Sequence, residues 1–338
     1  MPPSNTTTSN AGPGVIDTLS NGFDQINRML WIIALPIAMD LFLWLAPRVS
    51  ARPVINQLSQ WYGGLTQTYA SVASAGGSAA TFDQTQQALA TFEKAAGQFN
   101  LLSLLVLNVA GVPSILPTAL ANRPVWQINS LGTLIVAAIA SELVGSLIGC
   151  LYLALIGQQV RDGRIMPAKL GKQIGFFWLS VIGCMLLFVG LTLAVSLPVG
   201  LALGLVQLVA PGVGVALWLA AVAAIQIIAI LLVIYLFFLV DAIVVSQAGP
   251  IRAAVNSARV VANNFWSSVG FIILIYVISL GTQVIWTSLS QSPAGTLVAI
   301  IGNAYIASGL TAASMLYYQS RVAKLPAARG VVGRVTQI

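Results

Sequence analysis

Two apolar runs of membrane-spanning length, separated by a short basic segment, constrain the fold more than any other feature of this chain. Residues 216–245 and 266–289 are each long enough to cross about 30 Å of hydrocarbon as a helix. The segment between them, 250–265, is amphipathic and carries Arg252 and Arg259. We therefore expect the first run to descend to one membrane face, the segment to lie along that face, and the second run to return.

The composition places the whole chain in the membrane class. Hydrophobic residues make up 58% of the 338 residues. Charged residues make up only 7%, against about 25% in a soluble domain. We expect an all-α membrane protein with a bundle of about six transmembrane helices. The net charge of +7 comes from basic residues in short loops between spans, so the positive-inside rule explains it and we expect no nucleic-acid partner.

The sequence contains no histidine and two cysteines, Cys150 and Cys184. The commonest general base and the commonest metal ligand are therefore missing. Both cysteines lie within predicted spans and form no CxxC pair, so we interpret them as small buried hydrophobic residues. We expect no catalytic, metal-binding or cofactor-binding residues.

The first 125 residues divide into three predicted parts. Residues 1–28 are a flexible or interfacial segment. Residues 29–46 are the first transmembrane helix, a retained anchor rather than a signal peptide, because the preceding segment is net acidic and the apolar run is long. Residues 47–125 hold a small extracytoplasmic helical hairpin and the uncharged stretch 99–121. Because Pro113 and Pro117 leave only about 21 Å of clean helix there, we expect a re-entrant or interfacial segment. The alternative is a seventh span.

Residues 126–320 are predicted to form a five-helix transmembrane core, followed by a basic cytoplasmic tail at 321–338. The expected spans are 128–156, 176–197, 216–245, 266–289 and 296–318. Basic loops alternate with the uncharged connections 198–215 and 290–295, and ten of the fifteen basic residues fall on one face. We assign that face, and the C-terminus, to the cytoplasmic side of a bacterial inner membrane.

A set of residues in the second half resembles a large group of bacterial polytopic membrane proteins. The residues that carry the likeness are Tyr235, Asp241 to Val245, Gly249-Pro250, Ala253-Ala254, Ser257, Asn264 to Trp266 and Gly270. The best-known relative in that group is the membrane domain fused to some glycerophosphodiester phosphodiesterases. The resemblance covers about half of the chain and implies a six-helix bundle in the cytoplasmic membrane. It brings no catalytic residues, because the phosphodiesterase chemistry belongs to a separate soluble domain.

Three acidic residues lie within predicted spans. Glu142, near the middle of its span, is the intramembrane candidate for a functional site, as in proton or ion pathways. The competing interpretation is a protonated side chain that forms a hydrogen bond across a helix interface, where Gly145 and Gly149 permit close approach. Asp40 is expected to reach interfacial water or Arg48. Asp241 is expected to be solvated or paired with Arg252 or Arg259.

These observations favour a non-catalytic integral membrane scaffold or accessory subunit that organises lipids or partner proteins. The alternatives are a proton- or ion-coupled transporter or permease subunit that uses Glu142 and, as a weaker option, a lipid-active enzyme. We expect membrane lipids as partners, with a membrane protein or a second copy of the chain as further candidates. The candidates for binding anionic lipid are Arg164, Lys169, Lys172, Arg252 and Arg259, and the competing interpretation is that they only fix topology.

Overall fold

The computed structural model describes residues 14–72, 79–117 and 123–324. Helices dominate this part of the chain, which confirms the prediction of an all-α membrane protein. The described helices are α1 Val15–Asn27, α2 Ala34–Leu45, α3 Arg52–Val72, α4 Ala79–Gln98, α5 Leu131–Asp162, α6 Pro167–Val209, α7 Pro211–Tyr235, α8 Leu239–Val245, α9 Pro250–Asn263, α10 Phe265–Leu289 and α11 Pro293–Val322. Two 3-10 helices, η1 Leu30–Ile33 and η2 Leu101–Leu105, and two parallel strands, β1 Arg48–Ser50 and β2 Val125–Gln127, complete the elements.

Five described segments are long and apolar enough to cross a membrane: α5, α6, the α7–α8 pair, α10 and α11. A sixth crossing results if α1 and the η1–α2 stretch, which are bent by 88° to each other, form one broken span. The predicted first span, 29–46, is thus a 3-10 turn followed by the 12 residues of α2. Twelve residues rise only about 18 Å as a helix, so α2 does not cross by itself.

The stretch 99–121 forms no spanning helix within its described residues, 99–117. It contains only the five residues of η2 and then continues without regular structure to Pro117. The described part of this stretch is therefore not a helical span, and its re-entrant or interfacial placement stays a prediction. Residues 118–121 lie outside the described part, as do residues 1–13 and the tail arginines Arg329 and Arg334.

Helix α11 is the centre of the fold. Half of the residues in its most apolar window are buried, against about a fifth to a quarter in the other spanning segments. Small residues allow its neighbours to approach closely: a Cβ at Gly22 of α1 would lie 2.6 Å from the backbone nitrogen of Ala313. A Cβ at Gly309 would lie 2.4 Å from the ring of Phe23. Such small-residue contacts are the usual means by which membrane helices gain packing energy.

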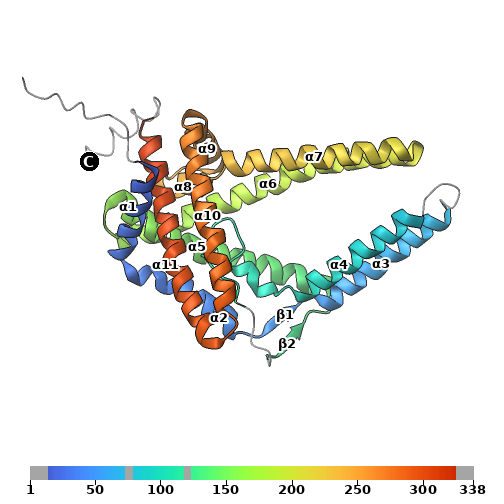
Figure 1. The fold of residues 1–338 in the computed structure, drawn as a ribbon, viewed down its shortest axis with the longest axis horizontal. Coiled ribbons are helices and arrows are strands. Elements are labelled where there is room, and N and C mark those ends of the chain that lie inside the picture. Colours follow the sequence, from blue (N-terminus) through green and yellow to red (C-terminus); the bar gives the residue numbers. More distant parts are fainter. Residues whose placement is uncertain (1–13, 73–78, 118–122, 325–338) are drawn as a thin grey trace, which may run out of the picture.

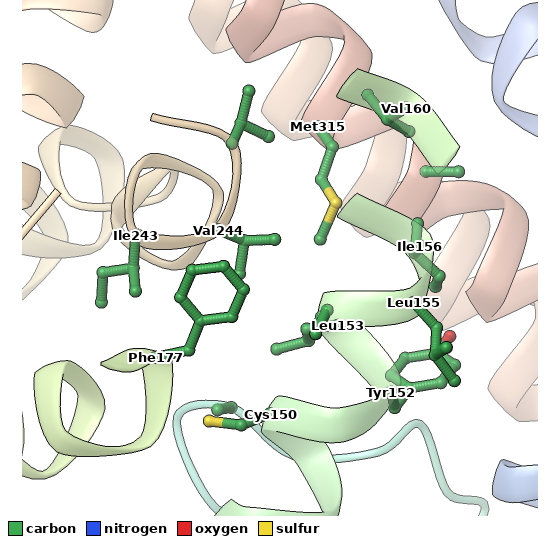
Figure 2. Packing of buried hydrophobic residues seen from close by; sticks show 14 of the residues in the cluster. Cys150, Tyr152, Leu153, Leu155, Ile156, Val160, Phe177, Ile243, Val244 and Met315 are labelled. Carbon is green, nitrogen blue, oxygen red and sulfur yellow. The ribbon is translucent and has the colours of Figure 1, made fainter. Parts of the chain in front are cut away.

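Helices α5, α6, α8 and α11 contribute to one buried cluster. Figure 2 shows Leu153 of α5 pointing toward Phe177 of α6 and Val244 of α8, while Tyr152 and Ile156 lie on another side of α5. Gly157 makes this meeting possible, because a Cβ there would lie 2.2 Å from a methyl group of Val244. Tyr152 is fully buried and its hydroxyl donates a hydrogen bond to Ser308 (2.9 Å). The polar group of this large aromatic residue is therefore satisfied within the bundle.

Two helical hairpins project from the core on the same side (Figure 1). The first is α3–α4, the hairpin that the apolar spacing in residues 47–98 predicts. The second is α6–α7, in which α6 continues through Pro198 to Val209 and the connection shortens to Ala210. The predicted connection 198–215 is therefore wrong. Membrane helices tolerate an internal proline because local adjustments satisfy the freed carbonyl group.

Residues 100–112 pack against α5 at two glycines, which generates a stability prediction. A Cβ at Gly149 would lie 1.6 Å from the carbonyl oxygen of Ala110, whereas one at Gly190 of the α6–α7 hairpin meets nothing within 4 Å. We expect Gly149→Ala to destabilise the protein by about 1–3 kcal/mol through overpacking. The matched change Gly190→Ala should leave stability unchanged or raise it slightly. Equal thermal unfolding midpoints in detergent for both variants would contradict this packing.

Candidate functional site

Helix α9 lies across the end of the core and has two apolar faces. Its buried face consists of Ala253, Ser257, Val260 and Val261. The spacing of apolar residues in 250–265 predicts a stripe of Ile251, Val255, Ala258, Ala262 and Phe265, which we expect to face either acyl chains or the bundle. In the structure this stripe points outward: Ile251 is 69% exposed, Val255 is 41% exposed, Ala262 and Phe265 are exposed, and Ala258 is half-buried. An exposed apolar stripe on a short helix at the end of a membrane bundle is typical of contact with acyl chains.

Two contacts fix α9 to the spans beneath it. The Ser257 hydroxyl donates a hydrogen bond to the carbonyl oxygen of Tyr235 (2.8 Å), one of the free acceptors at the end of α7. Pro250, the first residue of α9, rests on α6, where a Cβ at Gly183 would lie 2.8 Å from its ring. The sequence pattern alone does not reveal either contact, because both depend on which helices become neighbours.

Arg252 and Arg259 are exposed on α9, seven residues and therefore about two turns apart on one face. Arg164 in the α5–α6 turn and Lys169 and Lys172 in the first two turns of α6 are also exposed. Within the described residues the one close ion pair is Arg161 with Asp162 (2.7 Å), and the Asp162 carboxylate also attracts Lys169 and Arg164 electrostatically. No ion pair of the described chain involves Lys172, Arg252 or Arg259.

The α5–α6 turn, which contains Arg164 and precedes Lys169 and Lys172 on α6, has a defined geometry. Gly163 ends α5 with φ of +65°, a left-handed conformation that glycine adopts without strain. Gln158 then closes the loop, since its side-chain oxygen accepts a hydrogen bond from the Met166 backbone (2.8 Å) and its amide donates to Gln173 (2.6 Å). Pro167 starts α6 at a position where its missing N–H costs nothing. Arg164 therefore lies in a defined turn, and Lys169 and Lys172 lie on the helix that this turn positions.

Arg321 lies at the same end of the bundle and was predicted only as the start of the basic tail. It belongs to the last turn of α11, and its guanidinium carbon lies 5.1 Å from the ring centroid of Tyr317. One guanidinium nitrogen donates to Ser267 (3.3 Å), while Nε is buried and has no acceptor among the described residues. An unfilled donor on a cation is a feature that an anionic group would satisfy.

The structure corrects the expected partners of two acidic residues. Asp241 is buried in α8, where its carboxylate accepts a hydrogen bond from Ser314 of α11 rather than pairing with Arg252 or Arg259. Asp40 is also buried, and it accepts hydrogen bonds from the Ser114 hydroxyl and from the Ile115 backbone N–H (3.2 Å). Arg48 contacts the carbonyl oxygen of Gly97 instead. Each aspartate thus connects two parts of the chain.

Glu142 is half-buried on α5, and its Oε1 atom is buried without a hydrogen-bond partner in the described chain. The predicted bond across a helix interface is therefore absent there. Gly145 and Gly149 do permit a close approach, but to the backbone of Leu105 and Ala110 in the η2 segment rather than to another helix. Glu142 is not part of a metal site, since the described residues contain no group of three acidic, cysteine or histidine side chains that could hold a metal ion.

Comparisons with protein-family models, with curated proteins and with solved structures find no match to this chain. The resemblance to the phosphodiesterase-linked membrane domains stays a prediction. The candidate site is therefore defined by its own geometry: a short helix with an exposed apolar stripe, whose arginines Arg252 and Arg259 form no ion pair within the described chain.

The contrast between Asp241 and Glu142 generates a second stability prediction. Asp241→Leu should cost about 1–3 kcal/mol, because it leaves the Ser314 hydroxyl buried without its acceptor. Asp241→Asn should cost less, because the amide keeps an acceptor oxygen. Glu142→Leu should cause no loss, because it removes a buried atom that has no partner. Unfolding in mixed micelles measures all three, and a Glu142→Leu loss as large as that of Asp241→Leu would show that Glu142 has a structural partner.

Proposed function

We propose that this protein is a non-catalytic integral membrane scaffold that holds anionic lipids at its basic face. The observation that carries the proposal is the outward orientation of α9, which places Ile251 and Val255 toward acyl chains and Arg252 and Arg259 beside them. An interfacial helix of this kind gains binding energy from apolar burial and from anionic head groups together. The protein would lie in a bacterial cytoplasmic membrane with the C-terminus and α9 on the cytoplasmic side.

The charges at this end support lipid binding rather than topology alone. A topology signal requires only that basic residues remain on one side. Here Lys172, Arg252 and Arg259 are exposed and form no ion pair in the described chain, and Arg321 keeps a buried donor unfilled. At about 1 kcal/mol for each basic residue near the surface, such a group is sufficient to retain an anionic lipid.

The α6–α7 hairpin supports a scaffold role. Residues 173–240 contain no charged residue, and the outer part of the hairpin projects away from the core with large apolar side chains exposed (Figure 1). An exposed apolar surface of this size is unfavourable in water, and acyl chains would contact it in a membrane. We propose that the hairpin anchors the scaffold laterally among lipids.

A proton-coupled transporter is the second candidate, and the unpartnered Oε1 atom of Glu142 is the observation that favours it. An ionisable group inside a membrane span is expensive and is often retained for function. Proton-driven uptake into vesicles that is lost in a stably folded Glu142→Gln variant would favour this candidate over the scaffold.

The scaffold proposal is tested by charge reversal on α9. In Arg252→Glu/Arg259→Glu, we expect retention of phosphatidylglycerol or cardiolipin in native mass spectrometry to fall by at least about tenfold. The matched control, Arg52→Glu/Lys94→Glu, makes the same charge change on the exposed surface of α3–α4 and should retain lipid like the unmodified protein. Equal retention in both variants would reduce the α9 arginines to topology signals and overturn the proposal.

A further inference from the structure

A cavity of about 440 Å³ lies at the opposite end of α10 and α11 from α9. Its walls come from the end of α2, residues 115–117, the last turns of α10 and the first turn of α11. Figure 1 shows the α10–α11 turn beside α2 at the end of the bundle away from α9. The volume falls within the usual range of small-molecule sites, about 300–1,000 Å³.

The wall of this cavity is built from fixed parts. Trp44 and Trp286 are each only 8% exposed, and the Trp286 ring fits against α11 because residue 302 is glycine, where a Cβ would lie 2.5 Å from the ring. Asp40 holds Ile115 in the wall through its backbone N–H. Leu116 has φ of +49°, a left-handed conformation that is strained for a leucine and persists only where the surroundings impose it.

The described lining is uncharged and rich in amide and hydroxyl groups. Gln283 and Thr287 lie one turn apart on α10, and Ser290, Gln291, Ser292 and Thr296 lie at the α10–α11 turn and the start of α11. The side-chain amide of Gln283 makes no hydrogen bond within the described chain, and neither does the buried indole N–H of Trp286. A charged ligand would lose its hydration here without gaining a counter-ion, so the lining fits a neutral ligand with several hydroxyl or ether oxygens.

The cavity continues into a shallow groove along α10. The groove shares Gln283, Thr287 and Gln291 with the cavity and adds the exposed apolar residues Leu280 and Val284. Because α10 is a membrane-spanning helix, this groove leads from the cavity toward the hydrocarbon. A ligand that fills both parts needs a polar head and an apolar tail.

We infer that this site binds the uncharged, sugar-like head of a membrane amphiphile, whose tail lies in the α10 groove. Trp44 and Trp286 form part of the apolar wall, and the Gln283 side-chain amide can both donate and accept hydrogen bonds. The hydroxyls of Thr287, Ser290 and Thr296 already donate to backbone carbonyls, so they accept hydrogen bonds from sugar hydroxyls. The site lies at the end of α10 and α11 away from the basic face, and it prefers an uncharged head group where the basic face prefers an anionic one. The inference therefore does not depend on the scaffold proposal.

The test uses the full chain in phosphatidylcholine nanodiscs doped with one probe lipid at a time. The probes are monoglucosyl diacylglycerol, diacylglycerol and phosphatidylglycerol, and retained lipid is measured by native mass spectrometry. The variant Gln283→Leu/Thr287→Val removes polar groups that are exposed on α10, so the fold should persist. Gln226→Leu, which removes an equally exposed glutamine from α7, is the matched control.

We expect the unmodified protein and Gln226→Leu to retain the glucosyl lipid more than diacylglycerol. The double variant should retain about tenfold less of it, as expected for the loss of two hydrogen bonds. The double variant should retain as much phosphatidylglycerol as the unmodified protein.

The inference would be overturned if the double variant retained as much glucosyl lipid as the unmodified protein. It would also be overturned if the unmodified protein retained no more glucosyl lipid than diacylglycerol. Methyl glucoside that stabilises the protein in detergent as strongly as the glucosyl lipid would assign the cavity to a soluble sugar and would also overturn it. If the double variant unfolds at lower temperature than the control, Gln283→Leu alone replaces it, with the same expected direction.

Discussion

Close packing against one small-residue face of α11 is the interaction on which the rest of the structure depends. Ala312, Ala313 and Ser308 are fully buried there, and Gly22 brings α1 to within backbone contact of α11. Lipid tails remove the hydrophobic drive that joins helices in water, so association relies on such contacts and on hydrogen bonds between helices. The hydrogen bonds of Tyr152 to Ser308 and of Ser314 to Asp241 join α5 and α8 to the same helix.

This central helix separates two ends of different chemistry. At one end, α9 presents two exposed arginines beside an apolar stripe, and Arg321 in the last turn of α11 keeps a buried donor without an acceptor. At the other end, the α10–α11 turn and the segment fixed by Asp40 enclose tryptophan, amide and hydroxyl groups without a charged side chain in the described lining. From this difference we propose that the protein distinguishes anionic from uncharged lipid head groups at its two ends.

Hydropathy and charge were sufficient to predict the fold class, the five clear spans and the amphipathic character of 250–265, because these properties depend on local composition. Partner choice was not predictable. Asp40 and Asp241 find hydroxyl groups 74 and 73 residues away along the chain, and no local pattern encodes such pairings. The predicted end of the second core span at residue 197 was wrong, because Pro198 lies inside α6. A proline usually ends a helix in a soluble protein, but membrane helices tolerate one more readily. The cavity was not predicted, although Gln283 and Thr287, one turn apart in an otherwise apolar span, are a sequence signal that could have pointed to it.

The central claim is that α9 and the α10–α11 turn face opposite sides of the membrane. Single cysteines at Asn263 and at Ala294, both exposed positions, test it most directly in a background where Cys150 and Cys184 are replaced by alanine. In intact cells, an impermeant maleimide should label the cysteine at 294, and should label the one at 263 only after permeabilisation. Labelling of both cysteines from the same side would contradict the account, because α10 would then not cross the membrane.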